Sequence, residues 1–142
     1  MVTINPYLNF AGDTEEAFNF YRSVFGGEFS IVQRFKDTPE SGRVPENAKN
    51  KLMHIALPLG KVNTLMATDA LESMGHTFTA GDNIQLSVET ESKDEALKIF
   101  NGLSAGGTVK MPLADTFWGA YFGMLRDRFG IHWMVSHTPS NH

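Results

Sequence analysis

The sequence predicts an α+β fold in which one β-α-β-β-β module occurs twice within a single domain of residues 1–142. In each half, a strand-like alternation of apolar and polar residues is followed by helix-like apolar spacing and then by paired glycines. The two occurrences lie about 80 residues apart. We expect modules at 1–69 and 82–138, a connection at 70–81, and mostly antiparallel strands around a cavity between the modules.

The first module begins with the alternating segment Tyr7–Phe10. Asp13 stands three residues before Glu16, the spacing at which a capping side chain and a Glu satisfy the first amides of a helix. Gly26 and Gly27 can take the left-handed conformation that ends a helix. Three more strands are predicted, at 29–35, 52–57 and 62–67, with a long loop at 36–50.

The second module repeats this order, beginning with the strand Gln85–Val88. Ser92 and Glu95 have the spacing of a capping box, and Gly106 and Gly107 follow the predicted helix. Further strands are predicted at 108–111, 118–125 and 131–135.

Strand alternation separates the two faces of each predicted sheet. Leu8 and Phe10 point toward the first helix, and Leu86 and Val88 toward the second. Aromatic and thioether side chains are costly to leave in water, so the opposite face is expected to line the cavity. That face carries Asn5, Tyr7, Asn9, Met66, Asn83, Gln85, Ser87 and Met134.

Composition narrows the choice of partners and compartment. A net charge of −4 with scattered Lys and Arg gives no basic surface for nucleic acid or acidic membranes. The absence of cysteine removes disulfides and thiolate chemistry. No basic segment followed by an apolar run opens the chain, so we expect a cytoplasmic protein.

The segment Thr116–Phe122 is the densest aromatic stretch. Packing accounts for most of it, but Gly119 and Gly123 flank Tyr121 on one strand face and leave room for a ligand or a close backbone approach. Tyr121 is therefore a candidate cavity residue, and Trp118 a candidate for its rim. Arg126 could pair with an anionic ligand, although a surface salt bridge is the favoured interpretation.

Five segments distributed over nearly the whole chain form a recognisable set. They are Asn5–Phe10, Phe20 and Tyr21, Met53 and His54, Thr116–Gly119, and Asp127–Met134. Together they resemble the PhnB-like branch of the vicinal oxygen chelate superfamily, which includes glyoxalase I, extradiol dioxygenases, fosfomycin-resistance enzymes and bleomycin-binding proteins. The resemblance implies paired β-α-β-β-β modules in a glyoxalase-like, U-shaped sheet around a central site, usually in a homodimer. It does not imply one reaction.

Metal-using members of that superfamily bind a divalent ion through His or Glu on the first and last strands of each module. The resemblance places the corresponding positions at residues that are poor ligands for such an ion, so we expect neither a tightly bound catalytic metal nor a cofactor. His54 and His132 are interpreted as cavity-wall residues, and His76, His137 and His142 as loop or tail residues. The four vestigial metal positions are Asn5, Met66, Asn83 and Met134.

Other catalytic patterns find little support. Ser87, His54 and Asp69 could form a triad on paper, but no Gly-x-Ser-x-Gly turn marks a nucleophile. Some PhnB-like proteins carry a methyltransferase label, yet no glycine-rich turn links a strand to a helix ahead of an acidic ribose anchor.

Three functions stay open at this point. The favoured one is a protein that binds a small molecule in the cavity without catalysis. The alternative is a metal-independent or weakly metal-dependent lyase, transferase or dioxygenase-like enzyme for a small oxygen-rich substrate, with His54, Tyr121 or His132 as acid or base. A purely structural dimerisation module is the third. We also expect a homodimer, with residues 36–50 as either a dimer contact or a lid. The predicted ligand-binding residues are Tyr7, Asn9, His54, Gln85, Trp118, Tyr121 and His132.

Overall fold

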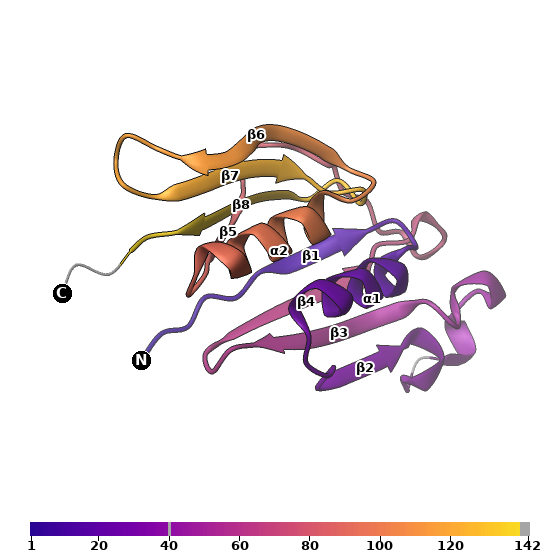
Figure 1. Ribbon diagram of the computed structural model, residues 1–142. Coiled ribbons are helices and arrows are strands. Elements are labelled where there is room, and N and C mark those ends of the chain that lie inside the picture. The colour runs from indigo at the N-terminus through magenta and orange to yellow at the C-terminus, as the bar shows by residue number, and fades with distance from the viewer. Residues whose placement is uncertain (40, 140–142) are drawn as a thin grey trace. The chain divides into compact units, whose positions relative to one another are not determined.

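The two halves of the chain fold as separate units with the same order of elements. The computed structural model describes residues 1–39 and 41–139. The first unit spans Met1–Thr79 and the second begins at Ala80. Each unit has the order β-α-β-β-β, so the predicted α+β fold with two modules is confirmed (Figure 1).

In the first unit a single helix packs on a four-stranded mixed sheet. The strand order is β1-β4-β3-β2, with β1 parallel to β4 and the other pairs antiparallel. The elements are β1 (Tyr7–Phe10), α1 (Thr14–Phe25), β2 (Ile31–Arg34), β3 (Leu52–Leu59) and β4 (Asn63–Asp69).

The second unit repeats this topology with the strand order β5-β8-β7-β6, and β5 is parallel to β8. Both helices have 12 residues, and within 1–39 and 41–139 no helix has the length and apolar character needed to cross a membrane. The elements are β5 (Leu86–Glu89), α2 (Lys93–Ser104), β6 (Thr108–Asp115), β7 (Tyr121–Arg126) and β8 (His132–His137).

Most of the predicted strands are found, but the one predicted at 118–125 begins later, at Tyr121. Residues 116–120 form a tight turn instead of the start of the strand. The Thr116 hydroxyl donates to the Ala120 carbonyl at 2.7 Å, and the Gly119 amide donates to the Thr116 carbonyl at 3.2 Å. The aromatic side chains of Phe117 and Trp118 therefore lie at the tip of the β6–β7 hairpin rather than in its strands.

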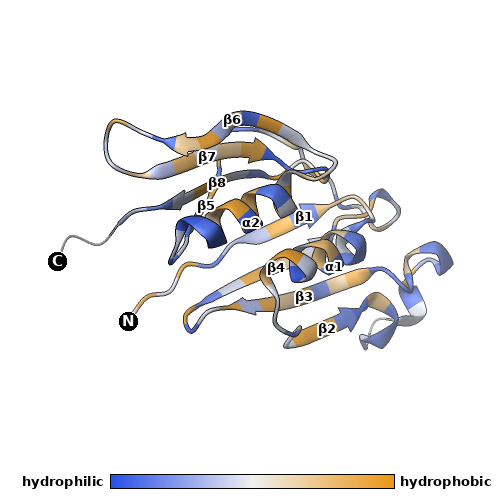
Figure 2. Ribbon diagram, in the orientation of Figure 1, coloured by the Kyte–Doolittle hydropathy of each residue, from blue (hydrophilic) through white to orange (hydrophobic). Residues whose placement is uncertain are grey.

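Alternation of apolar and polar residues places each core between a helix and one face of its sheet (Figure 2). Phe18 and Tyr21 of α1 are fully buried, as are Leu52, Ile55 and Leu65 of the sheet below. In the second unit the fully buried residues include Leu103 of α2 with Leu125, Trp133 and Val135.

The long loop after β2 has a small core of its own. It forms the short 3₁₀ helices η1 (Phe35–Asp37), η2 (Ser41–Arg43) and η3 (Glu46–Ala48). Phe35, Val44 and Ala48 are buried together against Leu71 and Met74. Glu72–Met74 form a further 3₁₀ helix, η4, in the predicted connection. The loop is thus packed onto the first unit, and its proposed roles as lid or dimer contact stay predictions.

A buried carboxylate from the far end of the unit caps α1. Asp13 was predicted to cap this helix, but its side chain makes no capping hydrogen bond. Instead Oδ1 of Asp69, at the end of β4, accepts the amides of Gly12 and Thr14 at 3.1 and 3.0 Å and the Thr14 hydroxyl at 2.6 Å. Its Oδ2 accepts the Leu52 amide at 2.8 Å. The prediction from sequence spacing was wrong because the capping residue, Asp69, is distant in the chain. It comes next to the start of α1 only after β4 pairs with β1.

At α2 the predicted Ser92 cap is confirmed, since its hydroxyl accepts the Glu95 amide at 3.0 Å. The Glu95 carboxylate reaches back one residue further than predicted, to the Glu91 amide at 3.0 Å. One amide of the first helical turn, that of Glu95, and the Glu91 amide just before the helix are therefore satisfied locally.

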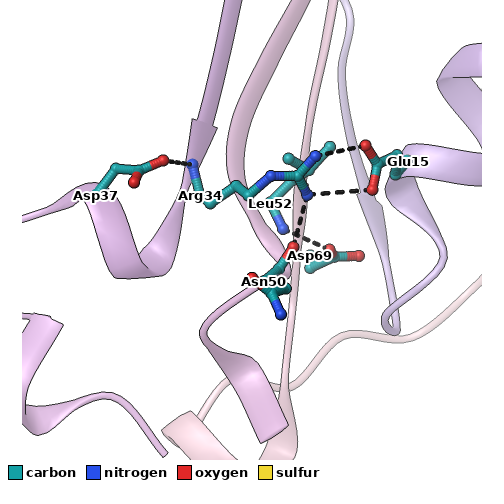
Figure 3. A network of polar contacts seen from close by, with 6 residues as sticks. All are labelled: Glu15, Arg34, Asp37, Asn50, Leu52 and Asp69. Carbon is teal, nitrogen blue, oxygen red and sulfur yellow. Dashed lines mark hydrogen bonds and ion pairs between the residues drawn. The ribbon is translucent and has the colours of Figure 1, made fainter. Parts of the chain in front are cut away.

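Arg34 joins three parts of the first unit (Figure 3). Its guanidinium donates to both carboxylate oxygens of Glu15, at 3.1 and 2.6 Å, and to the Asn50 carbonyl at 2.7 Å. The hydrogen bond from Arg34 lowers the pKa of Glu15. Because the paired side chains remain partly exposed, this bidentate contact positions β2 and the loop more than it stabilises the unit.

In the second unit the buried Asp127 carboxylate accepts hydrogen bonds at the β7–β8 turn, as Asp69 does at the start of α1 in the first unit. Its Oδ1 accepts the amides of Phe129 and Ile131 at 2.8 and 3.0 Å, and its Oδ2 accepts the Trp133 indole N–H at 2.8 Å. The turn also approaches the backbone at Gly107, where a Cβ would lie 2.9 Å from the Cα of Asp127. This close approach requires glycine at position 107, beyond its predicted use in ending α2.

Replacing Asp69 with Ala should destabilise the first unit. The substitution leaves three buried amide donors without an acceptor, so we expect the free energy of unfolding to fall by about 3 kcal/mol, at ~1 kcal/mol per donor. Urea denaturation followed by circular dichroism measures this. The exposed Asp82, replaced with Ala, is the matched control and should change stability by less than about 0.5 kcal/mol. Equal denaturation midpoints for the two variants would contradict the role given to Asp69.

Candidate functional site

Tyr7 and His54 form a stacked pair on the face of the first sheet that points away from α1, here called the far face. Their ring centroids lie 5.5 Å apart with an interplanar angle of 20°, and the Tyr7 hydroxyl lies 3.1 Å from Nδ1 of His54. Tyr7 comes from β1 and His54 from β3, so the two side chains meet across β4. The ring of Tyr7 is 47% exposed and can accept a further planar group.

The direction of this contact depends on the imidazole tautomer, because a neutral phenol can both donate and accept. Burial raises the pKa of the Tyr7 phenol, and a hydrogen bond with Thr68 opposes that rise, so the phenol stays protonated at neutral pH. In the tautomer with its hydrogen on Nε2, His54 accepts from the Tyr7 hydroxyl at Nδ1. In the described part of the chain no hydrogen bond engages Nε2 of His54, so in that tautomer it can donate to a ligand.

Strand register brings other predicted residues to the same face. Met66 is the partner of Tyr7, and Thr68 is the partner of Asn9, in the parallel β1–β4 pair. Asn9 is exposed and Met66 half-buried. Thr68 was not predicted as a site residue. Its alternation with Met66 on β4 was the available signal, but strand pairing had to be known before that signal could be used.

Asn5 does not stand free as a ligand. Its Oδ1 accepts the Thr64 amide at 2.9 Å, which holds the segment before β1 to the start of β4. An amide oxygen used in this way is a weak candidate for coordinating a divalent ion. Over 1–39 and 41–139 no group of three or more His, Cys, Asp or Glu side chains is placed to hold a metal. The donors present therefore do not fit the metal site of the resembling superfamily, and its four vestigial positions stay a prediction.

The far face of the second sheet carries a strip of methionines. Met124 pairs with Met111 on one side and with Met134 on the other, and Ser87 pairs with Met134. We call Met111, Met124 and Met134 the methionine strip. Gln85 lies beside it, and its Oε1 is buried without a hydrogen-bond partner among the described residues. Asn83 is exposed ahead of β5.

The two ends of the methionine strip differ in chemistry. At the hairpin end, Trp118 contacts Phe122 edge to face with ring centroids 5.7 Å apart, and Trp118 is 56% exposed. At the other end, His132 accepts a hydrogen bond at Nδ1 from Lys110 Nζ, at 3.0 Å. Lys110 was not predicted as a site residue, because it lies at an irregularity in β6 whose side-chain direction alternation cannot give.

Tyr121 lies on the helix side of its sheet rather than on the far face. The Lys93 ammonium at the start of α2 lies 5.1 Å from the centre of its ring. Gly123, on the same strand face, is close to Phe100 of α2, and a Cβ there would lie 2.7 Å from that ring. Gly123 thus serves a close approach between elements, whereas Gly119 lies in the β6–β7 turn with a φ of 92° and open space around it. Ligand contact by Tyr121 stays a prediction.

Two other histidines, His76 and His137, have structural partners. His76 accepts the Leu71 amide at 3.3 Å. His137 was predicted in a loop or the tail, but it is the last residue of β8, with Nδ1 2.9 Å from the Thr90 carbonyl. His142 lies outside the described residues. His54 and Asp69 have separate partners, Tyr7 for the first and backbone amides for the second, so the triad drawn on paper is not assembled.

Comparison with known proteins covers nearly the whole chain. A family model described as 3-demethylubiquinone-9 3-methyltransferase matches residues 2–136. The solved structure of PA1353 from Pseudomonas aeruginosa is 38% identical, with a TM-score of 0.86 over 99% of this chain and 100% of that one. A PhnB protein from Bacillus cereus is 28% identical, with a TM-score of 0.76 over 96% and 100% of the two chains.

A glyoxalase/bleomycin resistance protein/dioxygenase family enzyme from Burkholderia phytofirmans PsJN is 22% identical, with a TM-score of 0.64. The match covers 94% of this chain and 97% of that one. At this identity the likeness supports the fold alone.

Ionisation of the Tyr7 phenol should occur above the ordinary value of about 10. The difference between ultraviolet titrations of the wild type and Tyr7→Phe isolates this group from the other two tyrosines. We expect the missing component to titrate at higher pH because burial disfavours the phenolate. A component that titrates at or below the ordinary value would contradict the partial burial of the phenol.

Proposed function

Because the chain belongs to the family described as 3-demethylubiquinone-9 3-methyltransferase, in the PhnB-like branch of the glyoxalase/bleomycin resistance/dioxygenase superfamily, we propose that it binds a small planar molecule without a catalytic metal. The proposed site is the far face of the first sheet. The cavity between the modules stays a prediction from the sequence.

One observation carries this proposal: the stacked Tyr7–His54 pair, with its hydroxyl bonded to the imidazole. Such a pair offers a flat, partly exposed ring for stacking and an N–H on His54 for a ligand oxygen. Stacked aromatic contacts contribute about 0.5–1.5 kcal/mol beyond burial alone. Met66 and Thr68 beside the pair add an adaptable apolar surface and a hydroxyl.

Methyl transfer is not supported by the strand-to-helix turns, where adenosyl cofactors bind in doubly wound folds. The amides at the start of α1 donate to the Asp69 carboxylate. Those at the start of α2 are met by Ser92 and Glu95. Side chains of the protein thus accept hydrogen bonds from amides at both helix starts, and we do not propose methyl transfer for this chain.

The Tyr7–His54 contact also favours a second candidate, metal-independent acid–base chemistry on an oxygen-rich substrate. A phenol bonded to an imidazole can relay a proton, and both groups lie within reach of a bound ligand. Binding of a ligand without its conversion to a product supports the first candidate, and conversion to a product supports the second. We further propose a cytoplasmic homodimer, which a mass measurement in solution at micromolar concentration tests.

Substitutions at the pair should weaken binding of planar ligands. We expect 4-hydroxybenzoate, a water-soluble benzoquinone or bleomycin to raise the melting temperature of the wild type. For the ligand that binds, His54→Ala should lower affinity by about tenfold and Tyr7→Phe by about fivefold, because each loses a hydrogen bond.

Tyr121→Phe is the matched control, since that ring lies on the helix side of the second sheet. Its affinity should equal the wild type's. If Tyr121→Phe lost binding while Tyr7→Phe kept it, the site would be on the second unit and the proposal would be wrong.

Metal content tests the other half of the proposal. Protein purified without chelator should contain well under one mole of zinc, nickel, manganese or iron per mole of chain, because the donors at the vestigial positions are amides and thioethers. Elemental analysis by mass spectrometry measures it. A stoichiometric divalent metal that is lost in a His54→Ala variant would place a metal at the proposed site.

A further inference from the structure

Two cations on the far face of the second sheet, Lys110 and Arg126, have no acidic partner among the described residues. The only hydrogen bond that the Lys110 ammonium makes within the described residues is to the imidazole of His132. No carboxylate in the same part of the chain lies within ion-pair distance of Arg126, so the surface salt bridge favoured from the sequence is not found there. Uncompensated cations side by side repel each other, and an anion between them relieves that repulsion.

The strand register and one hydrogen bond bring Arg126 and Lys110 beside His132. Arg126 pairs directly with His132 in the antiparallel β7–β8 ladder, so their side chains share one face. Lys110 reaches across β7 from β6 to contact His132 at 3.0 Å. The Arg126 guanidinium extends toward Gly130, where a nitrogen lies 3.6 Å from the place a Cβ would occupy.

Three acids of the second unit, Glu89, Asp115 and Asp127, are engaged elsewhere. The Glu89 carboxylate accepts from the Ser136 hydroxyl and the Thr138 amide. Asp115 pairs with Lys93 at 2.8 Å. Asp127 is buried on the turn amides and the Trp133 indole. The cluster is therefore positive in a chain whose net charge is −4.

We propose that Lys110, Arg126 and His132 form a binding site for a phosphate or carboxylate group carried by a ligand with an apolar body. An ammonium only donates, so its bond to Nδ1 leaves the His132 hydrogen on Nε2. Lys110 has two further N–H groups, and Arg126 has its planar fork, which matches two anionic oxygens. The methionine strip beside the cluster offers the apolar surface on which the rest of the ligand lies.

This site is separate from the one under the proposed function, since it uses no residue of the first unit. Inorganic phosphate and phenyl phosphate are suitable probes, titrated to about 50 mM at constant ionic strength so that general screening is held fixed. Imidazole resonances of His132, assigned by their loss in His132→Gln, report binding by nuclear magnetic resonance. We expect saturable shifts with both probes and tighter binding of phenyl phosphate, whose ring buries apolar surface.

The variants Lys110→Gln and Arg126→Gln should each weaken binding by about tenfold, as the loss of one charge-assisted hydrogen bond predicts. Lys110→Arg should restore most of the affinity. The exposed Lys98 of α2, replaced with Gln, is the matched control and should leave affinity unchanged within about twofold. Circular dichroism shows that each variant is folded.

Shifts that grow linearly without saturation, or equal affinities for Lys110→Gln and Lys98→Gln, would overturn the site. Phenyl phosphate that binds no more tightly than inorganic phosphate would contradict the apolar half of the proposal. Tyr7→Phe should bind phosphate as the wild type does. A negative result for the phosphate site therefore does not count against the planar-ligand site of the first unit. A negative result for the planar-ligand site likewise does not count against the phosphate site.

Discussion

The first unit depends on one buried carboxylate. Asp69 is 1% exposed and accepts hydrogen bonds from the start of α1, from the Thr14 hydroxyl and from the first amide of β3. A buried charge is tolerated only when its oxygens are fully bonded, and these four donors meet that condition. The helix α1 and the two central strands, β3 and β4, are thereby held in one arrangement, and this fixes which side chains lie on the far face.

The second unit also has a buried carboxylate, which lies at a turn instead of a helix start. Asp127 is 2% exposed and connects the β7–β8 turn to the indole of Trp133, the largest fully buried side chain among the described residues. A related topology is thus stabilised by a carboxylate in both units, although one acts at a helix start and the other at a turn. In each case the carboxylate serves the helix side of the sheet, which leaves the far face available for polar and aromatic side chains.

The far faces carry the functional proposals because strand alternation frees them from core packing. In the first unit the result is an aromatic pair, Tyr7 and His54. In the second it is an apolar strip with a positive end, where Lys110 contacts His132. Neither set resembles a divalent metal site, since amides, thioethers and single imidazoles are poor substitutes for His and Glu clusters.

The sequence by itself determined the two-module α+β fold, the positions of both helices and the face assignment of β1, because periodicities of 3.6 and 2 residues are local properties of the chain. It also located Tyr7 and His54 as separate candidates. Only the tertiary structure decided that they touch, that Asp69 rather than Asp13 caps α1, and that Tyr121 faces Lys93. Each of these depends on which strands pair and in what register, or on an irregularity such as the one at Lys110, and those are set by contacts between residues far apart in the chain.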